Sequence, residues 1–235
     1  MKTVGLIGGI GCYSTIIYYQ AIIERISFQL GKGHTGNLVI YSIDEYEVIE
    51  PLNKKDWKAI TTVMKRVTEK IDKSGVDFLI ICSNTFHEFF DVVQENTKKP
   101  VIHILQPICE IIKKEKFQKI GLIGTSSTLL HNFYTDYLLQ RSPVKAVLKP
   151  THEHIDIMER IIFQELFINQ INSHSKKVLI EIIQSLINQG AEAVILGCTE
   201  FSLIISQKDV SVPVLDSTHL HAIYAADYMI KGKKI

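Results

Sequence analysis

The most informative segment of the chain is Gly190-Ala191-Glu192-Ala193-Val194-Ile195-Leu196-Gly197-Cys198-Thr199-Glu200-Phe201. A short apolar run with the composition of a buried strand ends at Gly197, presents one cysteine, and continues into a segment that predicts a helix. A cysteine at such a junction can have its pKa lowered by the positive end of a helix dipole and by free backbone N–H groups. Cys198 is therefore a candidate reactive thiol.

An earlier segment repeats this pattern. It reads Gly75-Val76-Asp77-Phe78-Leu79-Ile80-Ile81-Cys82-Ser83-Asn84-Thr85-Phe86 and aligns with the first segment without gaps. In that register Ser83, rather than Cys82, lies opposite Cys198. The two segments therefore present a hydroxyl and a thiol at equivalent positions.

A second repeat indicates an internal duplication. Lys119–Thr125 shares the run Gly-Leu-Ile-Gly with Thr3–Gly9. The spacing from the first glycine of that run is 78 residues to Ser83 in the first half and 77 residues to Cys198 in the second. Short apolar strands alternate with helical segments in both halves, which predicts parallel sheets covered by helices.

We therefore expect an α/β fold with two lobes related by a pseudo-twofold axis, each a parallel four-stranded sheet covered by helices. The predicted lobes are residues 1–98 with 216–235, and residues 99–215. Ligands of parallel sheets bind beyond the carboxyl ends of the strands, where both repeated turns lie. If the lobes pack face to face, Ser83 and Cys198 approach one interlobe cleft from opposite sides, and we expect the active site there.

Composition narrows the classes of protein that fit. The 235 residues are 46% hydrophobic and 22% charged, and the net charge of +1 gives no support for a nucleic-acid partner. The first apolar run is too short for a signal peptide or a membrane span, and no run of 18 apolar residues follows, so we expect a cytoplasmic protein without a membrane partner. The four cysteines, at positions 12, 82, 109 and 198, lack metal-site spacing, so we expect free thiols and no metal.

Two groups that face each other across a pocket suit the removal of a proton from one face of a carbon and its return to the other face. A thiol suits that work because its unperturbed pKa is about 8.5. The hydroxyls and backbone N–H groups of the turns can hold a carboxylate, although Ser and Thr there are equally suited to capping helices. The candidate substrate-binding residues are Gly9, Ile10, Asn84, Thr85, Thr125, Ser126, Ser127, Thr199 and Glu200.

Three motifs resemble the signatures of the aspartate/glutamate racemase family. They are Leu6-Ile7-Gly8-Gly9-Ile10-Gly11, Ser83-Asn84-Thr85 and Gly197-Cys198-Thr199-Glu200. The likeness covers nearly the whole chain and is nearest to the bacterial aspartate or broad amino-acid racemase branch. It implies a two-lobed, usually dimeric enzyme in which two cysteines deprotonate and reprotonate the α-carbon of an acidic amino acid without PLP or any other cofactor. We therefore expect a homodimer that acts on aspartate or glutamate.

The resemblance carries over two catalytic positions. The second is Cys198, and the first, immediately before Asn-Thr, is Ser83. Cys82 lies one residue early, so on a strand its side chain would point to the other face, although a shift at the strand end would bring its sulfur in. A serine hydroxyl is a far weaker acid than a thiol. We therefore expect Cys198 to be the competent base and Ser83 to relay a proton or to position substrate, with slow or one-sided turnover.

The residues that set specificity are less explicit. Aspartate racemases of the archaeal type are similar but carry an arginine in the loop after the second strand, whereas residues 42–50 hold no arginine and four acidic residues. Lys54 and Lys55 are the candidate substitutes. Glu200 can orient Cys198 or the substrate ammonium, and His87 lies either near the cleft or on a helix surface.

Two other functions stay open at this point. One is a one-thiol enzyme that resembles arylmalonate decarboxylase, which keeps only the second cysteine. The other is a dicarboxylate-binding protein with weak or no turnover.

Overall fold

The computed structural model describes residues 1–168 and 170–231. They form two compact units, which we call unit 1 (Met1–Ile104 with the segment that begins at His221) and unit 2 (Leu105–Leu220). The predicted boundaries followed residues 98 and 215, a few residues earlier. The difference arises because Ile104 and His221 belong to a hydrogen-bonded cluster of unit 1. Residues 232–235, which the prediction gave to the first lobe, lie outside the described part.

Unit 1 is built on a parallel sheet with the strand order β2-β1-β3-β4. The strands are β1 (Thr3–Gly8), β2 (Asn37–Ser42), β3 (Phe78–Ile81) and β4 (Val101–Ile102). The helices are α1 (Cys12–Leu30), α2 (Tyr46–Asn53), α3 (Trp57–Asp72), the 3-10 helix η1 (Thr85–Phe89), α4 (Phe90–Glu95) and most of α10 (Ser217–Lys231).

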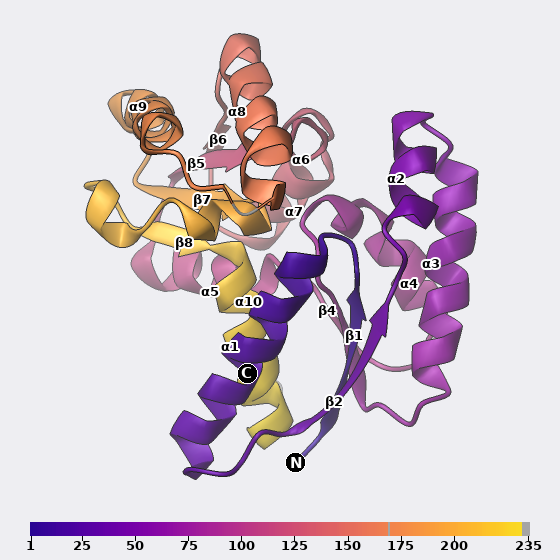
Figure 1. Ribbon diagram of the computed structural model, residues 1–235. Coiled ribbons are helices and arrows are strands. Elements are labelled where there is room, and N and C mark those ends of the chain that lie inside the picture. Colours follow the sequence, from indigo (N-terminus) through magenta and orange to yellow (C-terminus); the bar gives the residue numbers. More distant parts are fainter. Residues whose placement is uncertain (169, 232–235) are drawn as a thin grey trace. The chain divides into compact units, whose positions relative to one another are not determined.

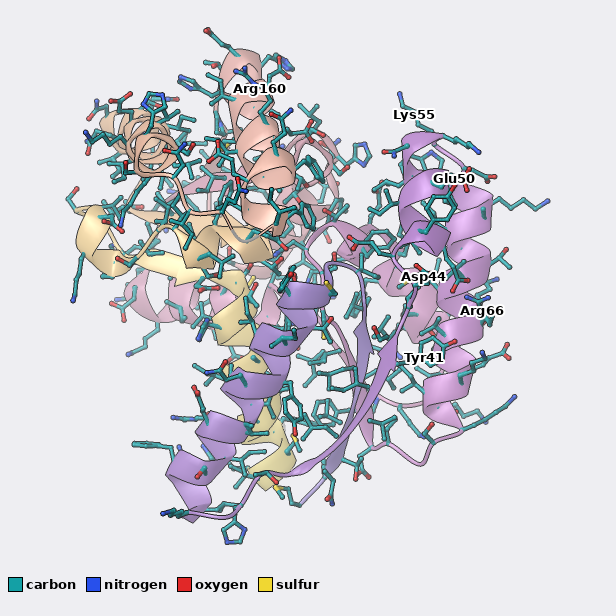
Figure 2. The ribbon with its side chains drawn as sticks, viewed as in Figure 1. Tyr41, Asp44, Glu50, Lys55, Arg66 and Arg160 are labelled. Carbon is teal, nitrogen blue, oxygen red and sulfur yellow. The ribbon has the colours of Figure 1, made fainter. Side chains whose placement is uncertain are left out.

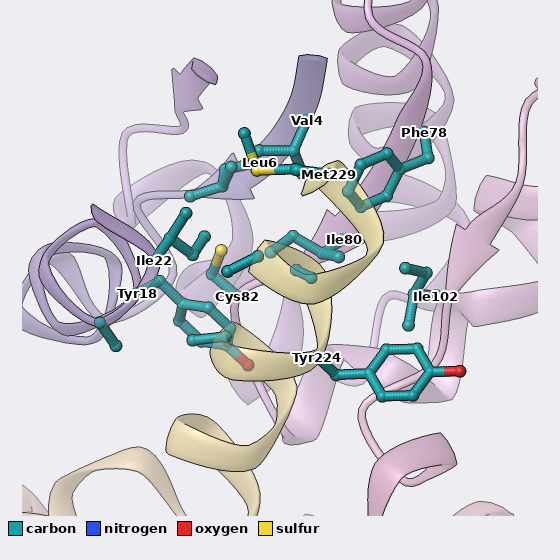
Figure 3. Packing of buried hydrophobic residues seen from close by; sticks show 14 of the residues in the cluster. Val4, Leu6, Tyr18, Ile22, Phe78, Ile80, Cys82, Ile102, Tyr224 and Met229 are labelled. Atoms are coloured by element: carbon teal, nitrogen blue, oxygen red, sulfur yellow. The ribbon is translucent and has the colours of Figure 1, made fainter. Parts of the chain in front are cut away.

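The two faces of this sheet carry separate cores. Helices α1 and α10 cover one face, and α3 and α4 cover the other (Figure 1). Along β3, Phe78 and Ile80 point into the first core, whereas Leu79 and Ile81 point into the second. Cys82 continues the first set and is fully buried beside α1 (Figure 3). Its thiol is thus part of the core, as the alternation of a strand predicts.

Unit 2 repeats the arrangement with the strand order β6-β5-β7-β8, again all parallel. The strands are β5 (Lys119–Gly124), β6 (Ala146–Leu148), β7 (Ala193–Gly197) and β8 (Val214–Asp216). The helices are α5 (Gln106–Glu115), α6 (Ser126–Leu130), α7 (Phe133–Arg141), α8 (His152–Gln164), α9 (Ser173–Asn188), the 3-10 helices η2 (Leu166–Ile168), η3 (Thr199–Leu203) and η4 (Gln207–Asp209), and the start of α10. The predicted architecture of two helix-covered, four-stranded parallel sheets is confirmed.

Local sequence signals explain where the helices lie. In α3 the buried residues Ile60, Met64, Val67 and Ile71 recur at helical spacing, and the Asp56 carboxylate caps the helix by accepting the N–H of Ala59 at 3.0 Å. None of the helices in residues 1–168 and 170–231 is long and apolar enough to cross a membrane.

Glycines allow β5 and β7 to end side by side. Gly124 and Gly197 are partners in the ladder between these strands. A Cβ atom on Gly197 would lie 2.9 Å from the carbonyl oxygen of Ile123, which is closer than real Cβ contacts allow. The glycine before Cys198 is therefore required by the sheet itself.

Candidate active site

The turn after β7 gathers three polar side chains in a buried network. The Cys198 thiol donates to Oε2 of Glu200 at 3.1 Å, and the Thr199 hydroxyl donates to the same oxygen at 2.6 Å. All three residues are at most 6% exposed. A carboxylate that accepts a thiol proton in a buried turn provides a local acceptor for that proton, and burial strengthens the interaction.

The electrostatics of this turn correct one expectation. Burial first, and the negative charge of Glu200 second, raise the pKa of the Cys198 thiol well above its ordinary value. The segment that follows is the short 3-10 helix η3, so Cys198 lies at no α-helix N-terminus. The expectation of a lowered thiol pKa was wrong, because a neighbouring carboxylate and burial act on the sulfur in place of a long helix dipole.

The neighbouring turn after β5 is mainly a helix cap. Thr125 is the N-cap of α6, and its hydroxyl accepts the N–H of Thr128 at 3.3 Å. The N–H of Ser126 donates to Oε1 of Glu159 at 3.1 Å, and the carbonyl of Ser127 accepts the N–H of His131 at 3.3 Å. Two of the three predicted substrate-binding residues here, Thr125 and Ser127, thus accept hydrogen bonds from backbone N–H groups of the same turn and helix.

In unit 1 the turn after β3 presents Ser83. Ser83 is buried, at 8% exposure, and its Oγ accepts the N–H of Phe86 in a long contact of 3.5 Å. Asn84 is buried and Thr85 is half-buried at the start of η1. Cys82 lies on the other side of the strand in the core, where burial raises its thiol pKa. Ser83 is therefore the residue of this pair that lies at the strand end.

His87 is buried rather than exposed on a helix surface. Its Nδ1 lies 2.6 Å from the carbonyl oxygen of Ser83, and its Nε2 accepts the N–H of Ile104 at 3.0 Å. Burial lowers its pKa to about 4. The ring packs against those of His103 and His221, with centroids 4.7 and 5.8 Å away. Sequence patterns missed this cluster, although the four-residue spacing from Ser83 to His87 is that of neighbours on one helical turn.

The glycine turn after β1 packs closely against the segment that follows β2. Gly9 has a φ of 83°, and a Cβ atom there would overlap the backbone of Ile43. The N–H of Gly9 donates to the Thr15 hydroxyl at 2.9 Å, and that of Gly11 donates to Oε1 of Glu45 at 3.2 Å. Ile10, between them, is buried in the second core of unit 1. The N–H of Gly9 thus bonds α1, and the N–H of Gly11 bonds the segment after β2. The missing side chain of Gly9 leaves space for Ile43 of that segment.

The cations near the acidic loop are engaged within unit 1. Lys54 forms an ion pair with Glu50 at 2.6 Å, and Arg66 pairs with Glu47. Lys55 lies beyond the far end of α2 from Asp44 (Figure 2). Lys54, which the sequence offered as a substitute for a carboxylate-binding arginine, is therefore already neutralised.

Metal chemistry finds no ligand set in the described residues. No group of three or more His, Cys, Asp or Glu side chains there could hold a metal ion. The buried His87 and His221 hydrogen-bond through their ring nitrogens to backbone groups and to the Tyr18 hydroxyl instead. The four cysteines are free thiols.

Comparison with known proteins places the chain in a family. The family model for Asp/Glu/hydantoin racemases matches residues 7–225. The chain belongs to the Asp/Glu/hydantoin racemase family. It is similar to the broad specificity amino-acid racemase RacX of Bacillus subtilis strain 168, with 22% identity over 229 residues and 92% of each chain covered.

Solved structures extend the comparison of this racemase-family chain. A Yersinia pestis protein assigned to the Asp/Glu racemases is 33% identical with a TM-score of 0.91, covering 98% of this chain and all of that one. An aspartate racemase homologue from Pyrococcus horikoshii OT3 is 32% identical with a TM-score of 0.83, covering 97% and 100%. Racemisation is an isomerase reaction, so membership supports a racemase activity for the chain.

Proposed function

We propose that the protein is a cofactor-independent amino-acid racemase in which Cys198 is the thiol base and Ser83 stands in place of a second thiol. The observation that carries the proposal is the 3.1 Å hydrogen bond from the Cys198 thiol to the buried Glu200 carboxylate. A thiol with a raised pKa is a poor base while it keeps its proton. The adjacent carboxylate of Glu200 can accept that proton.

The reaction begins with transfer of the thiol proton from Cys198 to Oε2 of Glu200. The resulting thiolate takes the proton from the α-carbon of the bound amino acid, and the electron pair of the broken C–H bond moves into the carboxylate as an enolate-like anion. Return of a proton to the opposite face gives the other enantiomer. Positioned general acids and bases of this kind accelerate proton transfer by about 100- to 10,000-fold.

Ser83 supplies or relays the second proton in this proposal. Its hydroxyl is a much weaker acid than a thiol, and its contact with the N–H of Phe86 is long. The proton that it donates is replaced from solvent, and the proton on Glu200 returns to solvent, so that the enzyme regains its starting state. Abstraction by Cys198, and with it α-carbon exchange, is therefore fast from one enantiomer only, and net interconversion is slow because every turnover needs the Ser83 proton.

Aspartate or glutamate is the proposed substrate. The names of the relatives support an acidic amino acid, and RacX supports a wider amino-acid range. Within unit 1 the acidic loop offers no arginine, and Lys54 is paired. The choice between the two therefore depends on direct measurement with both enantiomers of both amino acids.

The test follows exchange and interconversion separately. In D₂O, deuterium wash-in at the α-carbon is measured by NMR for L- and D-aspartate and for L- and D-glutamate, and chiral chromatography measures net conversion. We expect exchange from one enantiomer to exceed exchange from the other. Equal and fast exchange from both would falsify the one-thiol scheme, and no exchange from any of the four would remove the racemase proposal.

A one-thiol decarboxylase is the second candidate, and the hydroxyl of Ser83 at the first catalytic position favours it. Such an enzyme would release carbon dioxide from an arylmalonate and protonate the product at Cys198. Carbon dioxide release without amino-acid exchange identifies it. Dicarboxylate binding without either reaction identifies a binding protein.

A further inference from the structure

The imidazole of His87 joins two backbone segments, the turn after β3 and the loop after β4. The N–H of Ile104 can only donate, so Nε2 of His87, 3.0 Å away, must be the unprotonated nitrogen. The ring proton therefore lies on Nδ1, which donates to the carbonyl of Ser83 at 2.6 Å. Both ring nitrogens are used, and the ring is neutral.

The His87 ring lies just beyond the point at which β3 and β4 stop pairing. The ladder between β3 and β4 consists of the pairs Leu79–Val101 and Ile80–Ile102 and goes no further. Beyond it, the imidazole spans the gap between Ser83 and Ile104 and extends the connection to the residue at the strand end. A buried carbonyl and a buried N–H would otherwise lack these bonds, which is costly.

A second histidine, His221, bonds the end of β4 next to the His87 ring. His221 lies 3.0 Å through Nε2 from the carbonyl oxygen of Ile102 and 2.8 Å through Nδ1 from the Tyr18 hydroxyl. The carbonyl can only accept, so His221 carries its proton on Nε2, which is the tautomer opposite to that of His87. The end of β4 is thus bonded to His221 at Ile102, and the loop after it is bonded to His87 at Ile104. His87 in addition bonds the Ser83 turn.

We propose that His87 is a positioning residue that fixes the Ser83 turn, so that Ser83 and not Cys82 is presented at the carboxyl end of β3. Neighbouring side chains on a strand point to opposite faces, so a shift of one residue would exchange the two. The bond from His87 to the Ser83 carbonyl opposes that shift. Only the catalytic consequence rests on the proposed function; the structural part concerns unit 1 alone.

Two substitutions separate the two bonds of the ring. In His87→Asn the side-chain amide N–H₂ replaces Nδ1–H and keeps the bond to Ser83, whereas the acceptor for Ile104 is lost. In His87→Gln the longer amide replaces Nε2 as the acceptor for Ile104, whereas the donor to Ser83 is lost. Each variant keeps one of the two bonds, so the pair is matched in the number of hydrogen bonds lost.

Thiol labelling measures the Ser83 turn without any enzyme assay. Native protein is treated with iodoacetamide, and mass spectrometry follows Cys82 relative to Cys109, a buried thiol of unit 2 that reports global opening. Exposed Cys12 confirms that the reagent is active. We expect His87→Gln to raise Cys82 labelling relative to Cys109 by about tenfold, the value of one net hydrogen bond, and His87→Asn to leave it near wild type.

The same variants are then compared in α-carbon exchange. A misplacement of about 1 Å lowers turnover by on the order of 100-fold, so we expect kcat of His87→Gln to fall by about that factor with a smaller change in KM. We expect His87→Asn to retain most of the wild-type kcat. If the wild type shows no exchange, the proposed function fails while the labelling result still tests the positioning role.

Equal labelling of Cys82 in the two variants, or wild-type labelling in both, overturns the proposal. A wild-type measurement covers the case in which neither variant folds. In protein labelled with ¹⁵N-histidine at pH 7, NMR is expected to show His87 as the neutral Nδ1–H tautomer and His221 as the neutral Nε2–H tautomer. The Nε2–H tautomer or a charged ring at His87 would remove the bond on which the proposal depends.

Discussion

Glu200 interacts with both residues that precede it, so its charge can be removed without removing its shape. In Glu200→Gln the amide cannot take the thiol proton, and we expect turnover to fall by about 100-fold or more. The same change removes the negative charge that helps to raise the pKa of Cys198, so that pKa falls and alkylation of Cys198 becomes faster near pH 8. Chiral chromatography and the pH dependence of alkylation measure the two effects.

Glu159→Gln is the matched control, because Glu159 accepts a backbone N–H in the same unit but does not contact the thiol. It should leave the alkylation of Cys198 unchanged. Full turnover by Glu200→Gln would exclude the carboxylate as the proton acceptor.

Replacing Ser83 by cysteine restores a second thiol at the strand end. We expect Ser83→Cys to raise deuterium exchange from the enantiomer that the wild type handles slowly, by about tenfold or more, because a thiol is a much stronger acid than a hydroxyl. Ser83→Ala is the control and should lower exchange from that same enantiomer. A cysteine variant no faster than wild type would show that acidity at this position does not limit the reaction.

At the scale of single residues, the sequence predicts Cys198 and Ser83 as the catalytic pair because both follow repeated apolar strands. The same alternation assigned Cys82 to the core, where it lies. The raised pKa of Cys198 and the burial of His87 were not predictable from the sequence. Both depend on how a turn folds its side chains back, and residue spacing alone does not distinguish a 3-10 turn from the first turn of an α-helix.

Among the elements, the β1–α1 turn depends on a glycine that faces another backbone. Ala at Gly9 would have a positive φ and a Cβ that overlaps Ile43, so we expect Gly9→Ala to lower the free energy of unfolding by roughly 3 kcal/mol or more. Gly75 also has a positive φ, of 77°, but nothing lies within 4 Å of its Cβ position. Gly75→Ala should therefore lose only about 1 kcal/mol. Urea unfolding measures both, and equal losses would contradict the role given to Ile43.

Strands and amphipathic helices were the most predictable elements, because the spacing of their apolar residues can be read from the sequence. The glycine turn shows the limit of that approach. Glycines after a first strand suggest close approach of a backbone, but the sequence does not say whether the approaching group is a ligand or, as with Ile43, another loop.

At the scale of the whole molecule, the buried histidines of unit 1 make the stability of that unit sensitive to acid. Burial lowers the pKa of His87 to about 4, and burial together with His87 lowers that of His221 to about 3, from 6.5 in an unfolded chain. Between pH 6.5 and about 4 the unfolded state therefore binds more protons than the native state. Stability is full above pH 6.5 and falls as the pH drops, by up to about 1.4 kcal/mol per pH unit for each histidine.

Hydrogen exchange between pH 7 and pH 5, corrected for intrinsic rates, should show this loss in unit 1. The histidines of unit 2 are half-buried or exposed, so exchange there provides the internal control. An equal loss of protection in both units would mean that other groups control the acid response.

The expected homodimer stays a prediction, and light scattering at several concentrations measures it. The exposed apolar residues Ile16 and Tyr19 of α1 and Ile40 of β2 border a cavity of about 350 Å³ and form a surface suited to a partner. If this surface joins two copies, Ile16→Lys should yield monomers. Lysine at exposed Phe163 of unit 2 should not change the mass.

Helix α10 has a consequence for the order in which the molecule is made. Val4 and Leu6 of β1 pack in one core with Ala222, Ala225 and Met229, although the whole of unit 2 is translated between them. The ribosome therefore synthesises the whole of unit 2 before most of α10, the last helix of unit 1. Throughout that interval the part of the unit 1 sheet that α10 covers stays exposed, because α1 alone covers the rest of that face. Exposed apolar surface of this kind favours aggregation during synthesis.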